Sequence, residues 1–381
     1  MAERVGIVAV GQTKYSPNRA DVTEGELAYE AIKQVLEETG LTLSDIDSAV
    51  TSSQDFWDGR TISSLNIQSF VGAHLGHEDK VCEDAINAIY AGMAQILGSH
   101  IEIVLVVAHM KESQADKSIV ENAAFDPIFL RQLGLNFTSA AAMQAKRYMY
   151  KYEISPEQCA KVAVRNRRNA KANPFAQEPM DITVEDVLGS PMVTYPFRQL
   201  DTKPISDGAC AMILASEERA KKITRKPIWI TGIGNCYEKH YLGDRDLADC
   251  DALTTAAKRA YSMAGIKNPI KQIDVAEISG EYSYQELLWM EGLGFCDRGD
   301  AGKLADSRAT TIGGKLPVNP SGGVLPGNPN GVAGLARVAE SVLQLRGEAG
   351  DRQVDGANVA LAHGYTGICG QHQAVAILSN T

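Results

Sequence analysis

Two ionisable side chains lie close to apolar runs, and each is a candidate for acid–base chemistry. His363 stands in the segment ALAHGYTG, where Gly364 and Gly367 let the backbone approach a ligand closely. An imidazole there is suited to proton transfer near neutral pH, and its alternative role is structural, beside a strand. Glu281 follows the run DVAEI at an expected strand-to-helix turn, where its carboxylate can act as acid or base or can cap the next helix.

A cationic run and a Gly-rich segment are candidates for contacts with an anionic ligand. The run KVAVRNRRNAK (161–171) contains Arg165 and Arg168, which can bind phosphate groups or can form the solvated face of a helix. The segment GGKLPVNPSGGVLPGNPNGVAG (313–334) contains Gly323 and Gly327. It lacks the Gly-Lys-Ser/Thr of a P-loop, so we expect its glycines to bring backbone close to a substrate.

The cysteines do not form a metal or disulfide pattern. They are scattered, odd in number and never arranged as CxxC, at positions 82, 159, 210, 236, 250, 296 and 369. This spacing is typical of reduced thiols in a cytosol, and with no HExxH it predicts no metal site in this chain. A cysteine at a helix N-terminus has its pKa lowered by the helix dipole. Glu83 and Asp84, directly after Cys82, would oppose thiolate formation there.

The bulk composition predicts a globular protein with a large core. The chain has 381 residues, 44% of them apolar and 22% charged, which suggests two or three domain-sized units. A net charge of −10 argues against a nucleic-acid-coating surface. No run of about 18 apolar residues predicts a membrane span, and the N-terminus does not resemble a signal peptide. We therefore expect a cytoplasmic protein that binds neither nucleic acid nor membrane.

Two distant segments share one pattern, which indicates an internal duplication. Residues 29–53 and 256–280 each contain an amphipathic helical run that ends at a glycine, Gly40 or Gly265. A polar link and a short apolar run that is typical of a strand follow in both. The alternative is that both are ordinary helix–strand units.

Further elements agree between the two expected halves. Apolar strands at 5–10 and 228–233 would begin them, and helical runs at 83–97 and 332–345 lead into continuous apolar strands of the kind buried on both faces.

We expect an N-terminal half at 1–222 and a C-terminal half at 223–381. The stretch 112–200, with helices at 137–152 and 156–171, has no counterpart and is predicted to be an insertion over the active-site face.

Four segments, in order, resemble the thiolase superfamily. The Gly-rich segment resembles the signature loop GHPxGATG, and LDTKPISDGACAMIL, DVAEI with GEYSYQELLWMEGLGF, and ALAHGYTG also fit. The resemblance covers nearly the whole chain and is closest to sterol-carrier-protein-type and archaeal thiolases. It implies an α/β fold, with two mixed sheets layered with helices as α-β-α-β-α. It also implies a homodimer and a small separate zinc-ribbon/OB-fold subunit.

The same resemblance assigns site residues. A thiolase uses a cysteine thiolate to take an acyl group, while oxyanion holes stabilise developing charge. Counting back from IVLVVAHM places that cysteine on Cys82, at the head of the long helix, whereas counting forward from an earlier turn lands near Ile86 or Ile89. The family's GHPxG histidine is Asn328 here, whose amide can donate to a thioester carbonyl or can simply occupy a turn.

The remaining site residues follow from two further motifs. The subgroup's His-Asp-Cys-Phe is here Ser279-Gly280-Glu281-Tyr282, and His363 occupies a slot where relatives carry Cys or His. Tyr365 would add a phenol to the same cavity. The resemblance implies substrate or coenzyme A contacts for Gly323, Gly327, Arg165 and Arg168.

The implied activity is that of a CoA-dependent acyltransferase of the acetyl-CoA acetyltransferase type. It would cleave or form a 3-oxoacyl-CoA through a cysteine acyl-enzyme, with coenzyme A as substrate and no covalently bound cofactor. The lost histidines suggest a bulky, branched or acidic substrate, such as benzoylsuccinyl-CoA. The alternatives are a retro-aldol lyase acting on a 3-hydroxyacyl-CoA, as in relatives that lost the cysteine, and a non-catalytic scaffold subunit.

Overall fold

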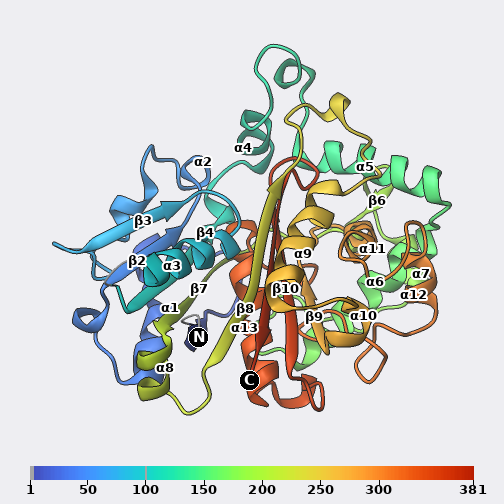
Figure 1. Cartoon of the computed structure of the whole chain (residues 1–381). Coiled ribbons are helices and arrows are strands. Elements are labelled where there is room, and N and C mark those ends of the chain that lie inside the picture. The colour runs from blue at the N-terminus through green and yellow to red at the C-terminus, as the bar shows by residue number, and fades with distance from the viewer. Residues whose placement is uncertain (1–3, 99–100) are drawn as a thin grey trace.

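The N-terminal sheet supplies the first layer of strands. A computed structural model describes residues 4–98 and 101–381 (Figure 1). The strands of the N-terminal sheet lie in the order β3 (His77–Val81), β2 (Ser48–Ser52), β4 (Ile103–Lys111), β7 (Asp207–Ser216) and β1 (Val5–Gln12). Strands β2, β3 and β4 are parallel, whereas β7 is antiparallel to β4 and β1. Strand β3 therefore forms one edge.

The C-terminal sheet continues from β1. Its order is β8 (Ile228–Tyr237), β11 (His372–Ser379), β10 (Val359–Thr366) and β9 (Val275–Ile278), with only β10 and β9 parallel. Two residue pairs between β1 and β8 join the halves into one nine-stranded sheet. The sequence predicted two mixed sheets layered with helices, and the structure shows them joined edge to edge by this short junction.

Helices fill three layers around the strands, which gives the predicted α-β-α-β-α order (Figure 1). Helices α3 (Ile86–Gly98) and α13 (Asn330–Arg346) share a core with strands of both halves. Helix α1 (Glu24–Thr39) packs on the outer face of the N-terminal strands. Helices α9 (Asp251–Ala264) and α11 (Ser283–Gly292) pack on the outer face of the C-terminal strands.

The duplicated pattern is visible in the elements themselves. Helices α1 and α9 both end at a glycine in the left-handed conformation, Gly40 and Gly265, each with φ of 71°. Helix α3 leads into β4 and helix α13 leads into β10, and each of these strands pairs in parallel with the strand that follows α1 or α9. The local sequence signals therefore specified equivalent units.

The stretch 112–200, which we predict to be an insertion, contains helices where the sequence predicts them. Helices α5 (Phe137–Tyr152) and α6 (Pro156–Asn169) begin at Asn136 and Ser155, whose side chains accept backbone N–H groups of the first turn. The other helices and the small hairpin are α2 (Asp55–Asp58), α4 (Lys117–Ala123), α7 (Val184–Gly189), α8 (Glu217–Ile223), α10 (Pro269–Gln272), α12 (Ala301–Asp306), β5 (Met192–Thr194) and β6 (Phe197–Arg198).

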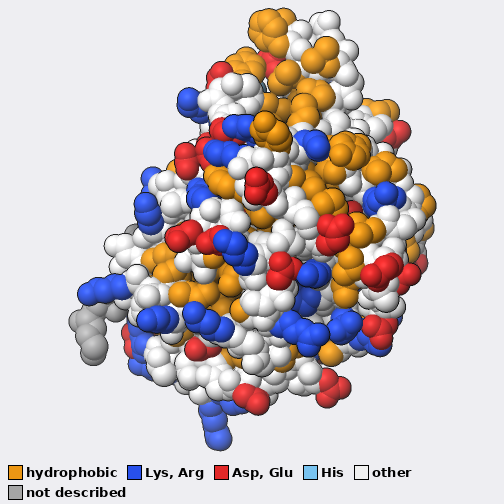
Figure 2. All heavy atoms as spheres, turned by 90° about the vertical axis from the view of Figure 1, so that its right-hand side faces the viewer, with side chains coloured by type: hydrophobic (Ala, Val, Ile, Leu, Met, Phe, Trp, Pro, Cys, Tyr) orange, Lys and Arg blue, Asp and Glu red, His pale blue; other side chains and the backbone are white. Residues whose placement is uncertain are grey.

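A projection that carries α4 rises above the layers in Figure 1, and Figure 2 shows apolar side chains gathered on it. Its exposed members include Ile119, Ile128, Phe129 and Leu133. Within the described ranges, no helix has the length and apolarity needed to cross a membrane.

Candidate active site

The head of helix α3 carries a carboxylate. The helix begins at Ile86, and Asp84 Oδ1 accepts from Ile86 N at 3.0 Å. Cys82 lies on the exposed segment between β3 and α3. We expected the helix to begin at residue 83 with Cys82 at its head, and this placement is wrong because the chain leaves the edge strand and turns for four residues before it becomes helical.

Asp84 is buried between the central helix of the other half and strand β10. Only 1% of it is exposed. A Cβ atom added to Gly334 or Gly364 would lie 1.9 or 2.0 Å from Asp84 Oδ1, so both glycines are needed to admit the carboxyl group. Its Oδ2 has no hydrogen-bond partner among the residues that the structure describes. Burial raises the pKa of Asp84 to about 7, although the N–H groups of Ile86 and Gly334 and the charge of Arg337 lower it.

Asn328 presents an amide that is fixed from one side. Its Oδ1 accepts from Arg337 Nη2 at 2.6 Å, and Arg337 Nη1 donates to Glu277 Oε2 at 2.7 Å. Because the carbonyl is held by Arg337, the NH₂ group must point the other way. No described residue accepts a hydrogen bond from it. This arrangement favours a donor role over a simple turn.

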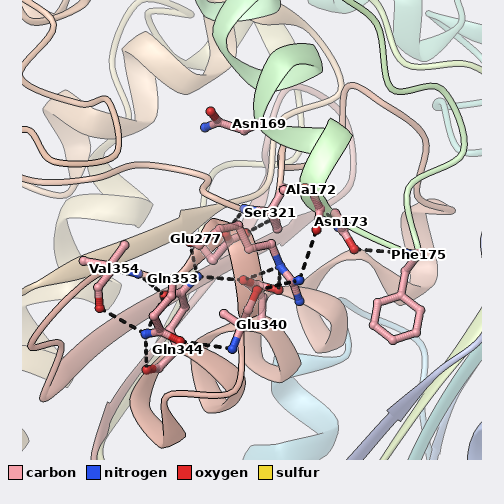
Figure 3. Close-up of polar contacts among 12 residues, drawn as sticks. Asn169, Ala172, Asn173, Phe175, Glu277, Ser321, Glu340, Gln344, Gln353 and Val354 are labelled. Atoms are coloured by element: carbon pink, nitrogen blue, oxygen red, sulfur yellow. Dashed lines mark hydrogen bonds and ion pairs between the residues drawn. The ribbon is translucent and has the colours of Figure 1, made fainter.

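A buried polar cluster holds the Gly-rich loop that carries Asn328 (Figure 3). Glu277 on β9 accepts from the backbone and hydroxyl of Ser321, at 3.0 and 2.7 Å. Asn173, beyond the end of α6, donates to Ser321 O at 2.9 Å, and Asn169 donates to Asn319 O at 2.9 Å. The loop is therefore tied to both the C-terminal sheet and the insertion.

Gly323 and Gly327 serve the packing of that loop. They have φ values of 69° and 109°, in the left-handed region that favours glycine. A Cβ atom would lie 2.7 Å from Asn319 Nδ2 at Gly323 and 2.7 Å from the Cβ of Gln177 at Gly327. Protein atoms occupy the space beside both glycines, so the close approach is to the chain itself.

Glu281 lies at the turn between β9 and α11, with one oxygen free. Tyr365 Oη lies 3.1 Å from Glu281 Oε1 and 2.8 Å from Gln285 Oε1. Glu281 Oε2 is buried, and no described residue forms a hydrogen bond with it. The Gln285 side chain accepts from the N–H groups of Glu281 and Tyr282, so Gln285 caps α11 and the capping alternative for Glu281 is wrong.

The α4 projection places two further ionisable groups near Glu281. Lys117 and Glu121 approach each other at 3.6 Å. Burial raises the pKa of Glu121 to about 7, with Lys117 lowering it and the charge of Glu281 raising it. The pKa of Lys117 is raised by Glu121, Glu281 and Glu112 against the effect of burial. Acid–base groups from the insertion thus lie within electrostatic range of Glu281.

His363 is fully buried on the opposite side of β10 from Gly364. Its Nε2 lies 2.7 Å from Gln373 Oε1, and Gln373 Nε2 donates to Gly370 O, so the imidazole Nε2 carries the hydrogen. Burial lowers the pKa of His363 to about 4, below the near-neutral range that we expected. The ring stacks with Tyr365 at 6.2 Å and packs against Trp289.

The two predicted arginines differ in whether their guanidinium groups are free to bind an anion. Arg165 forms a buried ion pair with Glu286 and donates to Thr310 Oγ1 at 2.6 Å. Arg168 is 64% exposed and lies 3.7 Å from Asp181. Both line a cleft of about 500 Å³ together with Lys161 and Arg308.

The structure brings the predicted residues together in two groups. His363, Tyr365 and Glu281 are linked through the phenol. Asn328, just before α13, is bonded to Arg337 of that helix, whose charge acts on Asp84. No described contact joins Cys82 to either group. Asp84 was missed because the sequence was read around the cysteine. An aspartate is favoured just before a helix, so its position before Ala85 and Ile86 was the signal in the sequence. No group of three or more metal-ligating side chains occurs in the part of the chain that the structure describes.

Two equivalent halves in an α-β-α-β-α arrangement, with a polar site at the starts of the two central helices, are characteristic of the thiolase class of enzymes. The sequence matches the family model "Thiolase, N-terminal domain" over residues 5–194 and "Thiolase C-terminal domain-like" over 234–380. The chain therefore belongs to the thiolase family, and the prediction of a thiolase-type enzyme is confirmed. Members of this family use coenzyme A as a substrate.

Three similar proteins illustrate the range of this family. An acetyl-CoA acetyltransferase of Methanothermobacter thermautotrophicus is 35% identical over 96% of this chain and 97% of its own length. The benzoylsuccinyl-CoA thiolase subunit BbsB of Thauera aromatica is 35% identical over 62% of each chain. The solved structure "Ltp2-ChsH2(DUF35) aldolase" is 28% identical, with a TM-score of 0.85 over 99% of this chain and 98% of that one. Two of these names describe a subunit or a complex.

Proposed function

We propose that this thiolase-type enzyme cleaves, or forms in reverse, the carbon–carbon bond beside a CoA thioester by retro-aldol chemistry on a 3-hydroxyacyl-CoA. The observation that carries the proposal is the identity of the residue at the head of α3. A carboxyl group, Asp84, is buried there, and the nearest cysteine, Cys82, is exposed and outside the helix.

Five of the six remaining thiols offer little support for a cysteine acyl-enzyme. A nucleophilic cysteine reacts as its thiolate, so its pKa must be low. Burial instead raises the pKa of five other thiols, those of Cys159, Cys210, Cys250, Cys296 and Cys369. The chemistry of the site therefore rests on proton transfer and hydrogen bonding.

The residues divide the reaction between them. The free NH₂ of Asn328 donates to the thioester oxygen and stabilises the enolate that forms when the carbon–carbon bond breaks. The free oxygen of Glu281, with Tyr365 beside it, transfers a proton at the α-carbon. The likeness to a solved aldolase supports the same assignment.

An assay with 3-hydroxy-3-phenylpropionyl-CoA tests the proposal. Retro-aldol cleavage would release benzaldehyde and acetyl-CoA without added coenzyme A, and Cys82→Ser would retain turnover within about twofold because an exposed surface thiol contributes little. Turnover that requires added coenzyme A and is lost in Cys82→Ser would contradict it.

A second candidate is thiolytic acyl transfer through Cys82, which the 35% identity to an acetyl-CoA acetyltransferase favours. Under this alternative the site would act on a 3-oxoacyl-CoA, including a bulky aryl-substituted one such as benzoylsuccinyl-CoA. Mass spectrometry after incubation with acyl-CoA distinguishes the two functions, because only the acyl-enzyme leaves a covalent adduct on Cys82. A chain with neither adduct nor turnover would be a scaffold subunit.

We propose that the coenzyme A phosphates bind at the cationic cleft of Lys161, Arg168 and Arg308. The exposed guanidinium of Arg168 is available to an anion, whereas Arg165 is already paired and would position the cleft wall. His363, buried and neutral, would support Tyr365 through ring packing.

For the assembly, we propose a homodimer and a small zinc-ribbon/OB-fold partner in the cytoplasm. Strand β3 is an edge strand with an unpaired outer side, and pairing edges across a two-fold axis is a common way to close such a sheet. Light scattering of the purified chain, alone and after co-expression with a candidate partner, tests both parts.

A further inference from the structure

We infer that Asp84 is the base that removes the proton from the 3-hydroxyl group of the substrate. This assignment rests on the proposed retro-aldol function and identifies the residue that begins the reaction.

The geometry of Asp84 points to a chemical role. One carboxylate oxygen accepts from the backbone of α3, whereas the other is buried and has no hydrogen-bond partner within 4–98 and 101–381. Gly334 on α13 and Gly364 on β10 both lack the side chain that would fill this space, so elements of the C-terminal half leave room for the carboxyl of the N-terminal half. A buried polar atom normally finds a partner, and a substrate hydroxyl would supply the missing one.

The neighbouring charges leave Asp84 unpaired. The charge of Arg337 lowers the pKa of Asp84, but the guanidinium donates its hydrogen bonds to Glu277, Ser321 and Asn328. Burial keeps the pKa of Asp84 near 7, so the carboxylate is present at neutral pH and is basic enough to accept a proton. Arg337 also holds the side-chain oxygen of the donor Asn328.

The other carboxylates nearby are committed elsewhere. Glu83 accepts from the phenol of Tyr237 at 2.9 Å on the exposed side of the segment. Glu277 forms a buried ion pair with Arg337. Asp84 is therefore the carboxyl group at the start of α3 that has an oxygen available.

The proposed step balances as follows. The Asp84 carboxylate takes the proton of the 3-hydroxyl, and the oxygen electron pair forms the carbonyl of the released aldehyde or ketone. The bond between C2 and C3 breaks, and its electron pair moves onto the thioester as an enolate. A proton reaches C2 by way of the Glu281 carboxyl, which gives the shortened acyl-CoA. Solvent then removes the proton from Asp84 and restores the proton on Glu281.

The test compares cleavage with a second reaction that needs no hydroxyl group. Exchange of the C2 protons of acetyl-CoA with D₂O requires the enolate and Glu281 but not the base at C3. Asp84→Asn should lower cleavage of 3-hydroxy-3-phenylpropionyl-CoA by at least about 100-fold, as loss of a general base does, while exchange stays within about threefold. Glu281→Gln should lose both reactions, and Glu83→Gln, the matched control, should keep both.

Two results would overturn the assignment. Cleavage by Asp84→Asn close to the wild-type rate would exclude a base at this position, and equal loss of cleavage and exchange would show a structural role. A wild-type enzyme that does not cleave the hydroxyacyl-CoA would instead refute the proposed function.

The Asp84→Cys variant gives a further test of the assignment that does not depend on lyase turnover. If residue 84 faces the reacting carbon, its thiol should accept an acyl group from acetyl-CoA and appear as an adduct in mass spectrometry. Absence of that adduct in a folded Asp84→Cys protein, shown by unchanged circular dichroism, would place residue 84 away from the substrate and overturn the assignment.

Discussion

The two central helices begin in contrasting ways, although they occupy equivalent places in the two halves. At the start of α13, Asn330 N donates to Glu112 Oε1 at 3.0 Å, and Glu112 forms a buried ion pair with Lys203 at 2.7 Å. At the start of α3, Asp84 accepts from its own helix and has no cation of its own. The Glu112 carboxylate, paired with Lys203, holds the start of α13 in place, whereas the Asp84 carboxyl has an oxygen that can exchange a proton.

The same contrast extends to what each helix start presents. The α13 side offers a neutral amide, Asn328, whose orientation is set by Arg337. The start of α3 offers the ionisable carboxyl of Asp84. Among the described residues, only backbone N–H groups orient it. A rigid donor and an adjustable base are the two groups that enolate chemistry requires.

The largest expected effect comes from removing Lys203, the cation that pairs with Glu112 at the start of α13. Lys203→Met leaves Glu112 buried and unpaired, which should destabilise the protein by about 3–5 kcal/mol. Urea denaturation followed by circular dichroism measures this change. Lys171→Met is the matched control, since Lys171 pairs with Asp181 on the surface and should change stability by less than about 1 kcal/mol. An equal effect of the two variants would mean that the buried pair does not fix α13.

A somewhat smaller effect is expected when the oriented amide is lost. Asn328→Ala should cost about 2.7–4 kcal/mol of transition-state stabilisation, seen as a lower kcat for cleavage, as removal of an oxyanion donor typically does. Asn328→Asp keeps an oxygen for Arg337 but has no donor, so it should lose a similar amount. Asn169→Ala, which releases a different point of the same loop, should retain most activity. A rate within twofold of wild type for Asn328→Ala would assign the amide to the turn.

The smallest expected effect is on the free energy of unfolding, through Asp84 at the start of α3. The pKa of Asp84 is about 7 in the folded protein and near 3.8 when unfolded, so the folded state binds more protons between these values. Wild-type stability should therefore fall as pH rises from about 4 to about 7 because of this group. Asp84→Asn removes that loss and should be about 1–3 kcal/mol more stable than wild type at pH 8, but nearly equal at pH 4.

Urea titrations at the two pH values measure that difference. A variant that is less stable than wild type at pH 8 would show that the charged carboxylate contributes to folding. In that case the contrast between the two helix starts would disappear.

Much of the architecture could be predicted because its signals are local. Helix α5 runs over the residues predicted for it, since Asn136 caps its first turn and an amphipathic pattern continues to Tyr152. Gly40 and Gly265 ended their helices as expected because a left-handed residue is favoured there. The Gly-rich loop and the apolar strands β4 and β10 were equally readable, and the family followed from them.

The sequence by itself determined the order of elements, the duplication, the family and the candidate residues Asn328, Glu281 and His363. Only the tertiary structure decided which residue heads α3, which carboxylates are paired and which polar atoms remain free. The physical reason is that capping and periodicity act within a few residues of chain. The charge state of a buried group depends instead on neighbours brought together from distant segments, such as Arg337, Gly334 and Gly364 around Asp84.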